Sequence, residues 1–92
     1  MEIKHKESEE AGVFYIEVEN QKPAEIQYVL EKDDRLIIQH TFVPESLSGK
    51  GIGKLLVDKT VLYAREHHLK VVPVCSFAKK IMEDDTYQDV LY

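Results

Sequence analysis

Cysteine is almost missing from this sequence, which holds only Cys75 among its 92 residues. One cysteine excludes an internal disulfide framework and fits a reducing compartment, so we expect the protein in the cytoplasm. Long hydrophobic runs are missing too: the longest, residues 71–75, is far too short to span a bilayer. The first ten residues, MEIKHKESEE, are polar and charged, so we expect neither a membrane anchor nor a secretory signal.

An excess of positive charge is missing as well. Lysine and arginine number 12 against 17 aspartates and glutamates, which gives a formal net charge of −5. Proteins that read duplex DNA usually have the opposite balance, because Lys and Arg neutralise phosphates, so nucleic acid is not an expected partner. The sequence has no H-E-x-x-H motif and no cysteine cluster, and it therefore predicts no metal site.

What the sequence does have is the composition of one folded domain. Hydrophobic residues make up 43% of it and charged residues 32%, as in a soluble globular chain rather than a disordered one. A chain of this length has room for one small core. We therefore expect a single domain over residues 1–92.

The first half of the chain has the pattern of three successive strands. Residues 13–18 (VFYIEV) are rich in β-branched and aromatic types, which favour a strand. Residues 24–32 alternate between two faces, as in a half-buried strand. The apolar face of this second strand consists of Ala24, Ile26, Tyr28 and Leu30. Asp33 and Asp34 predict a tight turn before a third strand over 35–43, so the three strands should form an antiparallel meander.

The second half begins with a helical pattern over residues 51–68. Its predicted buried stripe consists of Ile52, Leu55, Leu56, Lys59, Leu62 and Tyr63, with Lys59 as the polar exception, and Val57, Val61 and Ala64 widen it. Residues 71–75 (VVPVC) predict a strand buried on both faces, where Pro73 suggests an interrupted hydrogen-bond ladder. Ser76 is placed to cap a second helix over 77–83.

The expected architecture is an α+β fold with a mixed sheet, in which the meander is followed by a helix, a parallel strand and a helix. The tail, residues 84–92, is expected to add one more helical turn. A strand–helix–strand crossover is right-handed and parallel, so strands 35–43 and 71–75 should lie side by side. The loop 45–50 then lies at their carboxyl ends, where open α/β sheets bind ligands.

Three glycines fall within residues 49–53, at the mouth of the predicted helix. A Walker-type phosphate loop is excluded, because only three residues separate Gly49 from Gly53 and Leu55 stands where Ser or Thr is needed. A dinucleotide fingerprint is excluded too, because Lys54 stands where a third Gly or Ala is needed.

The glycine loop can still be a cradle of backbone N–H groups for a diphosphate. Glycine lets an anion approach the backbone, the helix N-terminus carries partial positive charge, and Lys50 and Lys54 add charge nearby. The alternative is a merely flexible entrance to the helix. Three glycines cost about 2–3 kcal/mol relative to alanine, which favours the cradle.

The segment SGKGIG, residues 48–53, resembles the acetyl-CoA signature Q/R-x-x-G-x-G/A of the GNAT superfamily of N-acetyltransferases. It matches at Gly51 and Gly53, while Ser48 stands in place of Gln or Arg. The segments HTFVPESLSGKGIGKLLVDKTVLYARE and VVPVCSFAKKIM are similar to a short, single-domain GNAT-like subfamily, which has a His-Thr pair before the loop and V-P-x-C-S/P-F on the next strand. The resemblance covers nearly the whole chain, most strongly residues 40–83.

The resemblance implies that the two central parallel strands splay apart and that acetyl-CoA is the cosubstrate. The pantetheine arm would lie in the gap, the diphosphate on the glycine loop, and residues 76–80 on the other side of CoA. The implied cofactor-binding residues are Thr41, Phe42, Val43, Ser48, Gly49, Lys50, Gly51, Ile52, Gly53, Lys54, Ser76, Phe77, Lys79 and Lys80. Two helices that full-size GNAT enzymes have between their first and second strands are missing, so the acceptor site should be open.

Two side chains are candidates for the chemistry of acetyl transfer. His40 and Cys75 lie near the ends of the adjacent parallel strands, and we expect both to face the gap. His40 can act as general base. Cys75 can take the acetyl group, with His40 lowering its pKa, or can protonate the departing CoA thiolate. The alternatives are a buried apolar role for Cys75 and a non-catalytic strand histidine. His67 and His68 should close the first helix, and His5 should belong to a polar terminus.

The leading interpretation is an acetyl-CoA-dependent N-acetyltransferase that acts on a primary amine of an unidentified small molecule or protein. The alternative is a non-catalytic module that binds acetyl-CoA or CoA, and a more remote one is an interaction domain that merely retains the fold. We expect a monomer or a weak homodimer.

Overall fold

The computed structural model describes residues 1–32 and 34–92, and in these residues it has five strands, two α-helices and two short 3-10 helices. The strands are β1 (Lys4–Glu7), β2 (Ala11–Ile16), β3 (Ala24–Glu31), β4 (Arg35–Phe42) and β5 (Lys70–Pro73). The helices are α1 (Ile52–Glu66) and α2 (Ser76–Ile81), with η1 (Glu45–Leu47) and η2 (Asp85–Tyr87) as the 3-10 helices. The predicted turn at Asp33 and Asp34 falls partly outside the described residues.

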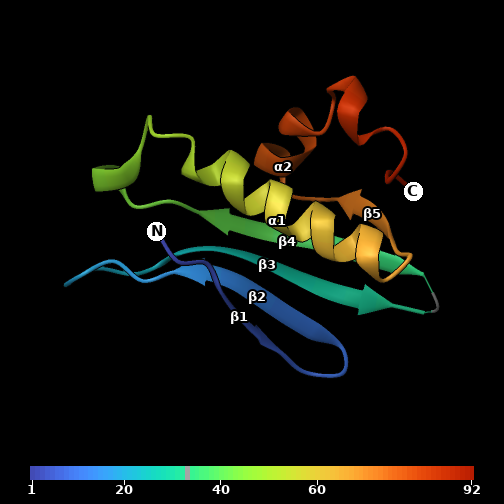
Figure 1. Ribbon diagram of the computed structural model, residues 1–92, viewed down its shortest axis with the longest axis horizontal. Helices are drawn as coiled ribbons and strands as arrows, with labels where there is room; N and C mark the ends of the chain where they lie inside the picture. The colour runs from blue at the N-terminus through green and yellow to red at the C-terminus, as the bar shows by residue number, and fades with distance from the viewer. Residues whose placement is uncertain (33) are drawn as a thin grey trace.

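The strands form a single mixed sheet in the order β1-β2-β3-β4-β5. The first four strands pair antiparallel, and β5 joins β4 in parallel through the crossover helix α1. This confirms the predicted mixed sheet, with a meander followed by a helix, a parallel strand and a helix. Figure 1 shows α1 lying across the sheet, with α2 beside it next to the end of β5.

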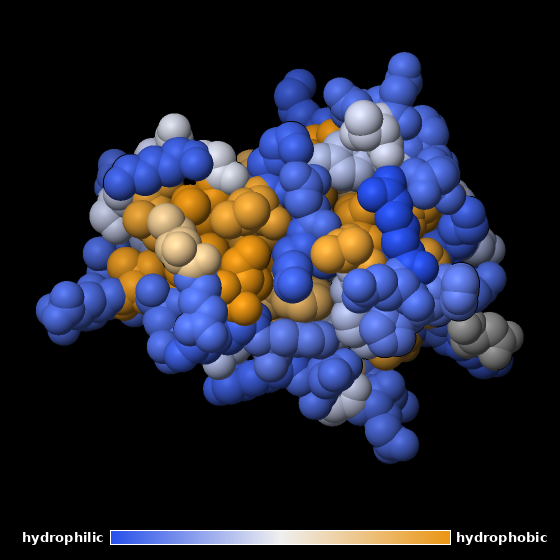
Figure 2. All heavy atoms as spheres, in the orientation of Figure 1, coloured by the Kyte–Doolittle hydropathy of each residue, from blue (hydrophilic) through white to orange (hydrophobic). Residues whose placement is uncertain are grey.

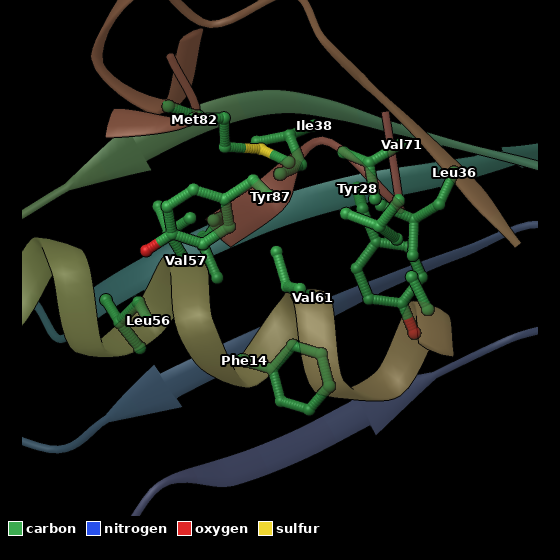
Figure 3. Packing of buried hydrophobic residues seen from close by; sticks show 14 of the residues in the cluster. Phe14, Tyr28, Leu36, Ile38, Leu56, Val57, Val61, Val71, Met82 and Tyr87 are labelled. Atoms are coloured by element: carbon green, nitrogen blue, oxygen red, sulfur yellow. The ribbon is translucent and has the colours of Figure 1, made fainter. Parts of the chain in front are cut away.

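The core lies between α1 and one face of the sheet. Ala24, Ile26 and Tyr28 are buried, so the period of two predicted for this strand holds. Val57 and Val61 of α1 belong to the same buried cluster, and Figure 3 shows them in one layer with the side chains of the sheet. The opposite face of the sheet stays open to solvent at polar positions such as Gln27. In the described residues, neither helix has the length or the apolar character needed to cross a bilayer.

Strand β1 was not predicted, because its residues are mostly charged. It pairs with β2 as an edge strand, where exposed Lys side chains discourage further pairing. His5 is its inward-facing residue: the ring stacks on Phe14 with centroids 4.0 Å apart, and Nε2 lies 2.8 Å from the Tyr28 hydroxyl. The interpretation of His5 as part of a polar terminus was therefore wrong.

The buried stripe of α1 differs from the predicted one. Its buried residues are Ile52, Gly53, Leu56, Val57, Thr60, Val61 and Ala64. The prediction is confirmed for Ile52, Leu56, Val57, Val61 and Ala64. Leu55, Lys59 and Leu62 are exposed instead, and Gly53 and Thr60 are buried although they were not predicted. Thr60 fits the core because its hydroxyl donates to the backbone carbonyl of Leu56 at 2.9 Å, which satisfies the buried polar group.

The end of α1 follows the expectation for the two histidines. His67 is the C-cap residue, and its backbone N–H donates to the carbonyl of Tyr63 at 3.0 Å. His68 has a positive φ of 58°, and the following Leu69 N–H donates back to Ala64 at 2.8 Å. This left-handed residue with a bond back into the last turn ends the helix.

In the C-terminal third, one detail corrects the sequence interpretation and another agrees with the helical turn expected in the tail. The N-cap of α2 is Cys75, and no side chain caps the helix, so Ser76 is its first residue rather than its cap. The tail forms a short 3-10 helix in which Asp84 accepts from the Thr86 N–H at 2.9 Å. It then bridges β5, because the Val71 N–H donates to the carbonyl of Val90 at 2.7 Å.

Pro73 does not interrupt the β4–β5 ladder. The N–H groups of Lys70 and Val74 point to β4, whereas the N–H of Val71 points to the outer edge of β5. By this alternation, the position of Pro73 also faces the outer edge, where a missing N–H breaks no bond to β4. A proline at this position also discourages pairing along that edge.

Candidate functional site

The two parallel strands part before β4 ends. Their paired register stops at Ile38 opposite Pro73. The carbonyl oxygen of Ile38 accepts from the backbone N–H groups of both Val74 and Cys75, each at 3.0 Å. Strand β4 continues to Phe42 with only β3 beside it, and Figure 1 shows it running on past the end of β5. The predicted splay is therefore confirmed, and it begins at the residue after Ile38.

A β-bulge lies where the strands begin to part. On the other side of β4, Tyr28 pairs with Ile38 and Gln27 pairs with His40, so Gln39 is an extra residue on β4. A bulge of this kind reverses the alternation of side chains that follows it. Without the extra residue, alternation from the buried Ile38 would have placed His40 on the helix-covered face of the sheet.

The bulge puts the His-Thr pair on opposite faces. Residues directly opposite each other in an antiparallel pair share a face of the sheet. His40 lies opposite Gln27 and is exposed on the open face, whereas Thr41 lies opposite the buried Ile26 on the helix face. We expected both His40 and Cys75 to face the gap together, but the structure brings Thr41, not His40, to the cysteine.

Cys75 is half-buried, and its Sγ donates to the Thr41 Oγ1 at 3.5 Å. Burial by itself would raise the pKa of the thiol. The Thr41 hydroxyl and the backbone N–H groups of Ala78 and Phe77 outweigh burial, and the pKa of Cys75 falls below its usual value. The thiol is therefore easier to ionise than an ordinary one. The Thr41 contact escaped the sequence analysis, which weighed only His40 as a partner for the thiol.

The loop before α1 presents its backbone amides. Gly49 and Gly51 have φ values of 78° and 75°, in the left-handed region that glycine adopts without strain. Gly51 is the N-cap of α1, with no side-chain cap, and the first helical bond runs from the Leu55 N–H to the Gly51 carbonyl at 3.0 Å. Within the described residues, the N–H groups from Gly49 to Lys54 donate to no protein acceptor, as expected for an anion cradle.

A hollow of about 280 Å³ lies between this loop and α2. It is lined by Val43, Leu47, Ser48, Gly49, Gly51, Ile52, Gly53, Lys54, Phe77 and Ile81. Figure 2 shows hydrophobic side chains gathered on this face beside the start of α1, with hydrophilic ones around them. Most of the predicted cofactor residues thus meet in one place, and Leu47 and Ile81 join them.

The sequence that forms this site matches a known family. The profile of the GCN5-related N-acetyltransferase family matches residues 13–90. The chain belongs to this family. No curated protein matches it.

A solved structure supports the assignment. It is the solution NMR structure of a GCN5-like protein from Staphylococcus aureus, provisionally an N-acetyltransferase. This neighbour is 42% identical, with a TM-score of 0.75, and the match covers 97% of the present chain and 87% of the neighbour. The overall fold of this GCN5-related N-acetyltransferase domain therefore has a counterpart in an experimental structure.

The lysines of this N-acetyltransferase domain are not equally placed for a phosphate. Lys54 lies at the rim of the hollow, but its Nζ donates to Asp58 at 2.8 Å. Lys50 is exposed in the loop itself. Lys79 lines a different hollow, beside the outer edge of β5, and Lys80 is exposed on α2. Of the four, Lys50 and Lys54 lie closest to the loop amides.

The remaining predicted residues fall at the borders of the hollow. Ile52 is buried, so only its backbone can face a ligand. Phe42 ends β4, where the Nζ of Lys22 lies 5.9 Å from its ring centroid. Ser76 is exposed on the first turn of α2. Among the described residues, no three His, Cys, Asp or Glu side chains gather closely enough to hold a metal ion.

The open face of the sheet carries a second, larger hollow of about 530 Å³. It extends across β1, β2 and β3 and reaches the bulge at Gln39. Glu25 and Gln27 line it, with the Gln27 amide hydrogen-bonded to the Glu25 carboxylate. This hollow lies on the same face of the sheet as His40, which pairs with Gln27.

Proposed function

We propose that this chain is an acetyl-CoA-dependent N-acetyltransferase that acetylates a primary amine. The observation that supports it most is that two parallel strands part, and that the amides of the loop from Gly49 to Lys54 donate to no acceptor among the residues that the structure describes. The gap suits an extended arm, and the amides suit a diphosphate. We keep the cytoplasm, and a monomer or weak homodimer, as predictions.

The binding step would use backbone groups more than side chains. The diphosphate would accept from the loop amides at the N-terminus of α1, where the helix contributes partial positive charge. Lys50 and Lys54 would add charge. The pantetheine arm would lie along the edge of β4 from Thr41 to Val43, which faces the gap and has lost β5 as its neighbour. The arm would thus supply the pairing that β5 does not.

The chemical step would be divided between the two faces of the sheet. The amine nitrogen attacks the thioester carbonyl, the carbon–sulfur bond breaks, and the amine must lose a proton while the CoA sulfur must gain one. His40, exposed on the open face, is placed to accept the proton of an amine that arrives there. Cys75 lies on the other face with Thr41, and can either protonate the leaving thiolate or take the acetyl group itself.

One observation favours the alternative of a binding module without activity. The bulge separates His40 from Cys75, so the two residues do not form the hydrogen-bonded nucleophile–base pair typical of cysteine acyltransfer. A module that only binds acetyl-CoA needs the loop and the gap, and it needs no base.

Calorimetry with acetyl-CoA and thiol release over a panel of polyamines, amino acids and peptides distinguish these functions. We expect binding together with thiol release for at least one amine. In His40→Ala, thiol release should fall about a hundredfold with unchanged affinity for acetyl-CoA. Binding without release for any amine would favour the module. An absence of binding at tens of micromolar would contradict both functions.

Substitutions at the loop test the cradle itself. Gly51→Ala should weaken acetyl-CoA binding about tenfold, because alanine in the left-handed region costs about 1–2 kcal/mol. Leu62→Ala is the matched control, since Leu62 is exposed on α1 and does not line the hollow. Equal affinities of these two variants would show that the loop does not hold the ligand.

A further inference from the structure

The ring of Phe77 lies directly on the backbone of Gly53. A Cβ added to Gly53 would lie 2.2 Å from the Phe77 Cζ and 2.5 Å from its Cε2, far closer than van der Waals contact. Gly53 is part of α1 and has no positive φ. A helical backbone accepts any residue except proline, so its conformation does not require glycine there. The ring does require it, because only a residue without a Cβ leaves room for Phe77.

The same phenylalanine is adjacent to the reactive end of α2. Phe77 is the second residue of α2, and Cys75 is its N-cap. The backbone N–H of Phe77 is one of the groups that favour the thiolate form of Cys75, together with the Thr41 hydroxyl. The ring that rests on Gly53 and this N–H belong to one residue, so a shift of the Phe77 backbone that accompanies a displacement of the ring would move the N–H relative to the sulfur.

Phe77 also contacts the space in front of the glycine loop. It lines the hollow together with Gly49 and Gly51, and 44% of its surface is exposed there. A group that settles on the loop amides therefore meets the ring. The contact between Gly53 and Phe77 links the start of α1, which carries the loop, to the start of α2, which carries the thiol.

We propose that Phe77 is a positioning residue that couples the glycine loop to the Cys75 thiol, so that occupation of the loop changes the reactivity of Cys75. The part that concerns the free protein stands on the contacts of Gly53, Phe77 and Cys75. The part that concerns an occupied loop rests on the proposed function, because it requires the loop to bind the nucleotide end of CoA.

The first test measures Cys75 in the free protein. Because the chain has one cysteine, the pH profile of alkylation by iodoacetamide reports on this thiol alone. In Phe77→Ala the midpoint of the profile should rise by about half a pH unit, because the Phe77 N–H no longer has a fixed place beside the sulfur. Leu55→Ala, an exposed apolar residue of α1 that does not line the hollow, should leave the midpoint unchanged.

Gly53→Ala makes the test specific to the contact. Alone, it should push the ring away and raise the midpoint as Phe77→Ala does. Added to Phe77→Ala, it should change nothing further, because the space of the ring is then free for the new methyl group. Phe77→Leu, which keeps apolar bulk, serves if the alanine variant does not fold. Unchanged midpoints in the folded variants, or equal effects of Gly53→Ala with and without the ring, would overturn the proposal.

The second test uses 3′-phosphoadenosine 5′-diphosphate, which has the diphosphate of CoA and lacks the pantetheine arm, so it cannot cover the thiol. In the wild type it should change the alkylation rate of Cys75 at least about twofold, and in Phe77→Ala the change should disappear. Calorimetry on the same samples separates two failures. Binding without a change in rate would contradict the coupling. Failure of the nucleotide and of acetyl-CoA to bind would contradict the proposed function.

Discussion

The two ends of α1 differ in whether the polar groups there have hydrogen-bond partners within the protein. At its N-terminal end, the amides from Gly49 to Lys54 have no acceptor in the part of the chain that the structure describes, and β4 has lost its parallel neighbour. At its C-terminal end, side chains of the helix are paired with polar groups of other elements. The Tyr63 hydroxyl donates to Glu7 at 3.1 Å, and the guanidinium of Arg65 donates to both carboxylate oxygens of Asp89, at 3.1 and 2.7 Å.

The C-terminal end of α1, called the paired end below, lies near the contacts that attach strand β1 to the rest of the sheet. Tyr28 reaches across β2 at Gly12, and its hydroxyl lies 2.8 Å from the Nε2 of His5 on β1. Burial and the neighbouring Tyr63 raise the pKa of Tyr28 well above its usual value, so the phenol stays protonated. The comparison suggests that one end of the molecule supplies stability and leaves the other free to expose unpaired backbone groups for a ligand.

Two glycines, one at each end, test this division most directly. A Cβ on Gly12 would lie 2.3 Å from the Tyr28 Oη and 2.4 Å from its Cζ, and Tyr28 is buried and cannot move aside. Gly12→Ala should therefore lower the free energy of unfolding by about 3 kcal/mol, measured by urea denaturation. A Cβ on Gly49 would meet nothing within 4 Å. Gly49→Ala should cost only the strain of its positive φ, about 1 kcal/mol.

The effects of the two substitutions on acetyl-CoA binding should have the opposite order to their effects on stability. Gly49→Ala should weaken acetyl-CoA binding, while Gly12→Ala, once folded, should bind as the wild type does. If Gly12→Ala were no less stable than Gly49→Ala, the division between a stabilising end and a binding end would be wrong.

A smaller effect is expected from the hydroxyl of Tyr28. Tyr28→Phe removes the hydrogen-bond partner of His5 without changing the ring, and should cost about 1–1.5 kcal/mol. Tyr92→Phe is the control, because Tyr92 is exposed and its hydroxyl should contribute less than about 0.5 kcal/mol. Urea denaturation of both variants measures the difference. Equal losses would mean that the buried bond to His5 contributes nothing special.

Sequence reasoning predicted the elements whose patterns are long and regular. The alternation in β3 placed Ala24, Ile26 and Tyr28 in the core, where the structure has them. The helical period located α1 and most of its buried face, but not the limits of that face. Leu55 and Leu62 are apolar but exposed, while Gly53 and Thr60 are buried. A hydropathy pattern cannot show that the ring of Phe77 leaves room at position 53 only for a residue without a Cβ.

The candidate site was predicted less completely than the fold. The loop, the gap and their neighbours followed from the motif, but the orientation of His40 did not. The orientation of His40 depends on one extra residue, Gln39, in β4. Because Gln39 and His40 are both polar, the hydropathy pattern does not show which of them is the extra residue. Strand β1 escaped for a related reason, because a four-residue edge strand with one inward-facing histidine has too little pattern to detect.

The smallest expected effect is a pH dependence of stability that comes from His5. Burial lowers the pKa of His5 in the folded protein, and Lys59 and His67 nearby act in the same direction, against the opposing effect of Glu7. The folded pKa therefore lies below that of the unfolded chain, which is about 6.5. As the pH falls through this window, the unfolded chain takes up a proton that the folded protein resists, so stability decreases.

Between pH 7.5 and 5.5 the wild type should lose stability, and His5→Asn should lose less. His68→Asn is the control, because His68 is exposed and its left-handed backbone suits asparagine. Urea denaturation at both pH values measures the slope. If the free energy of unfolding changed equally with pH in His5→Asn and in the wild type, protonation of His5 would not affect the stability of the paired end.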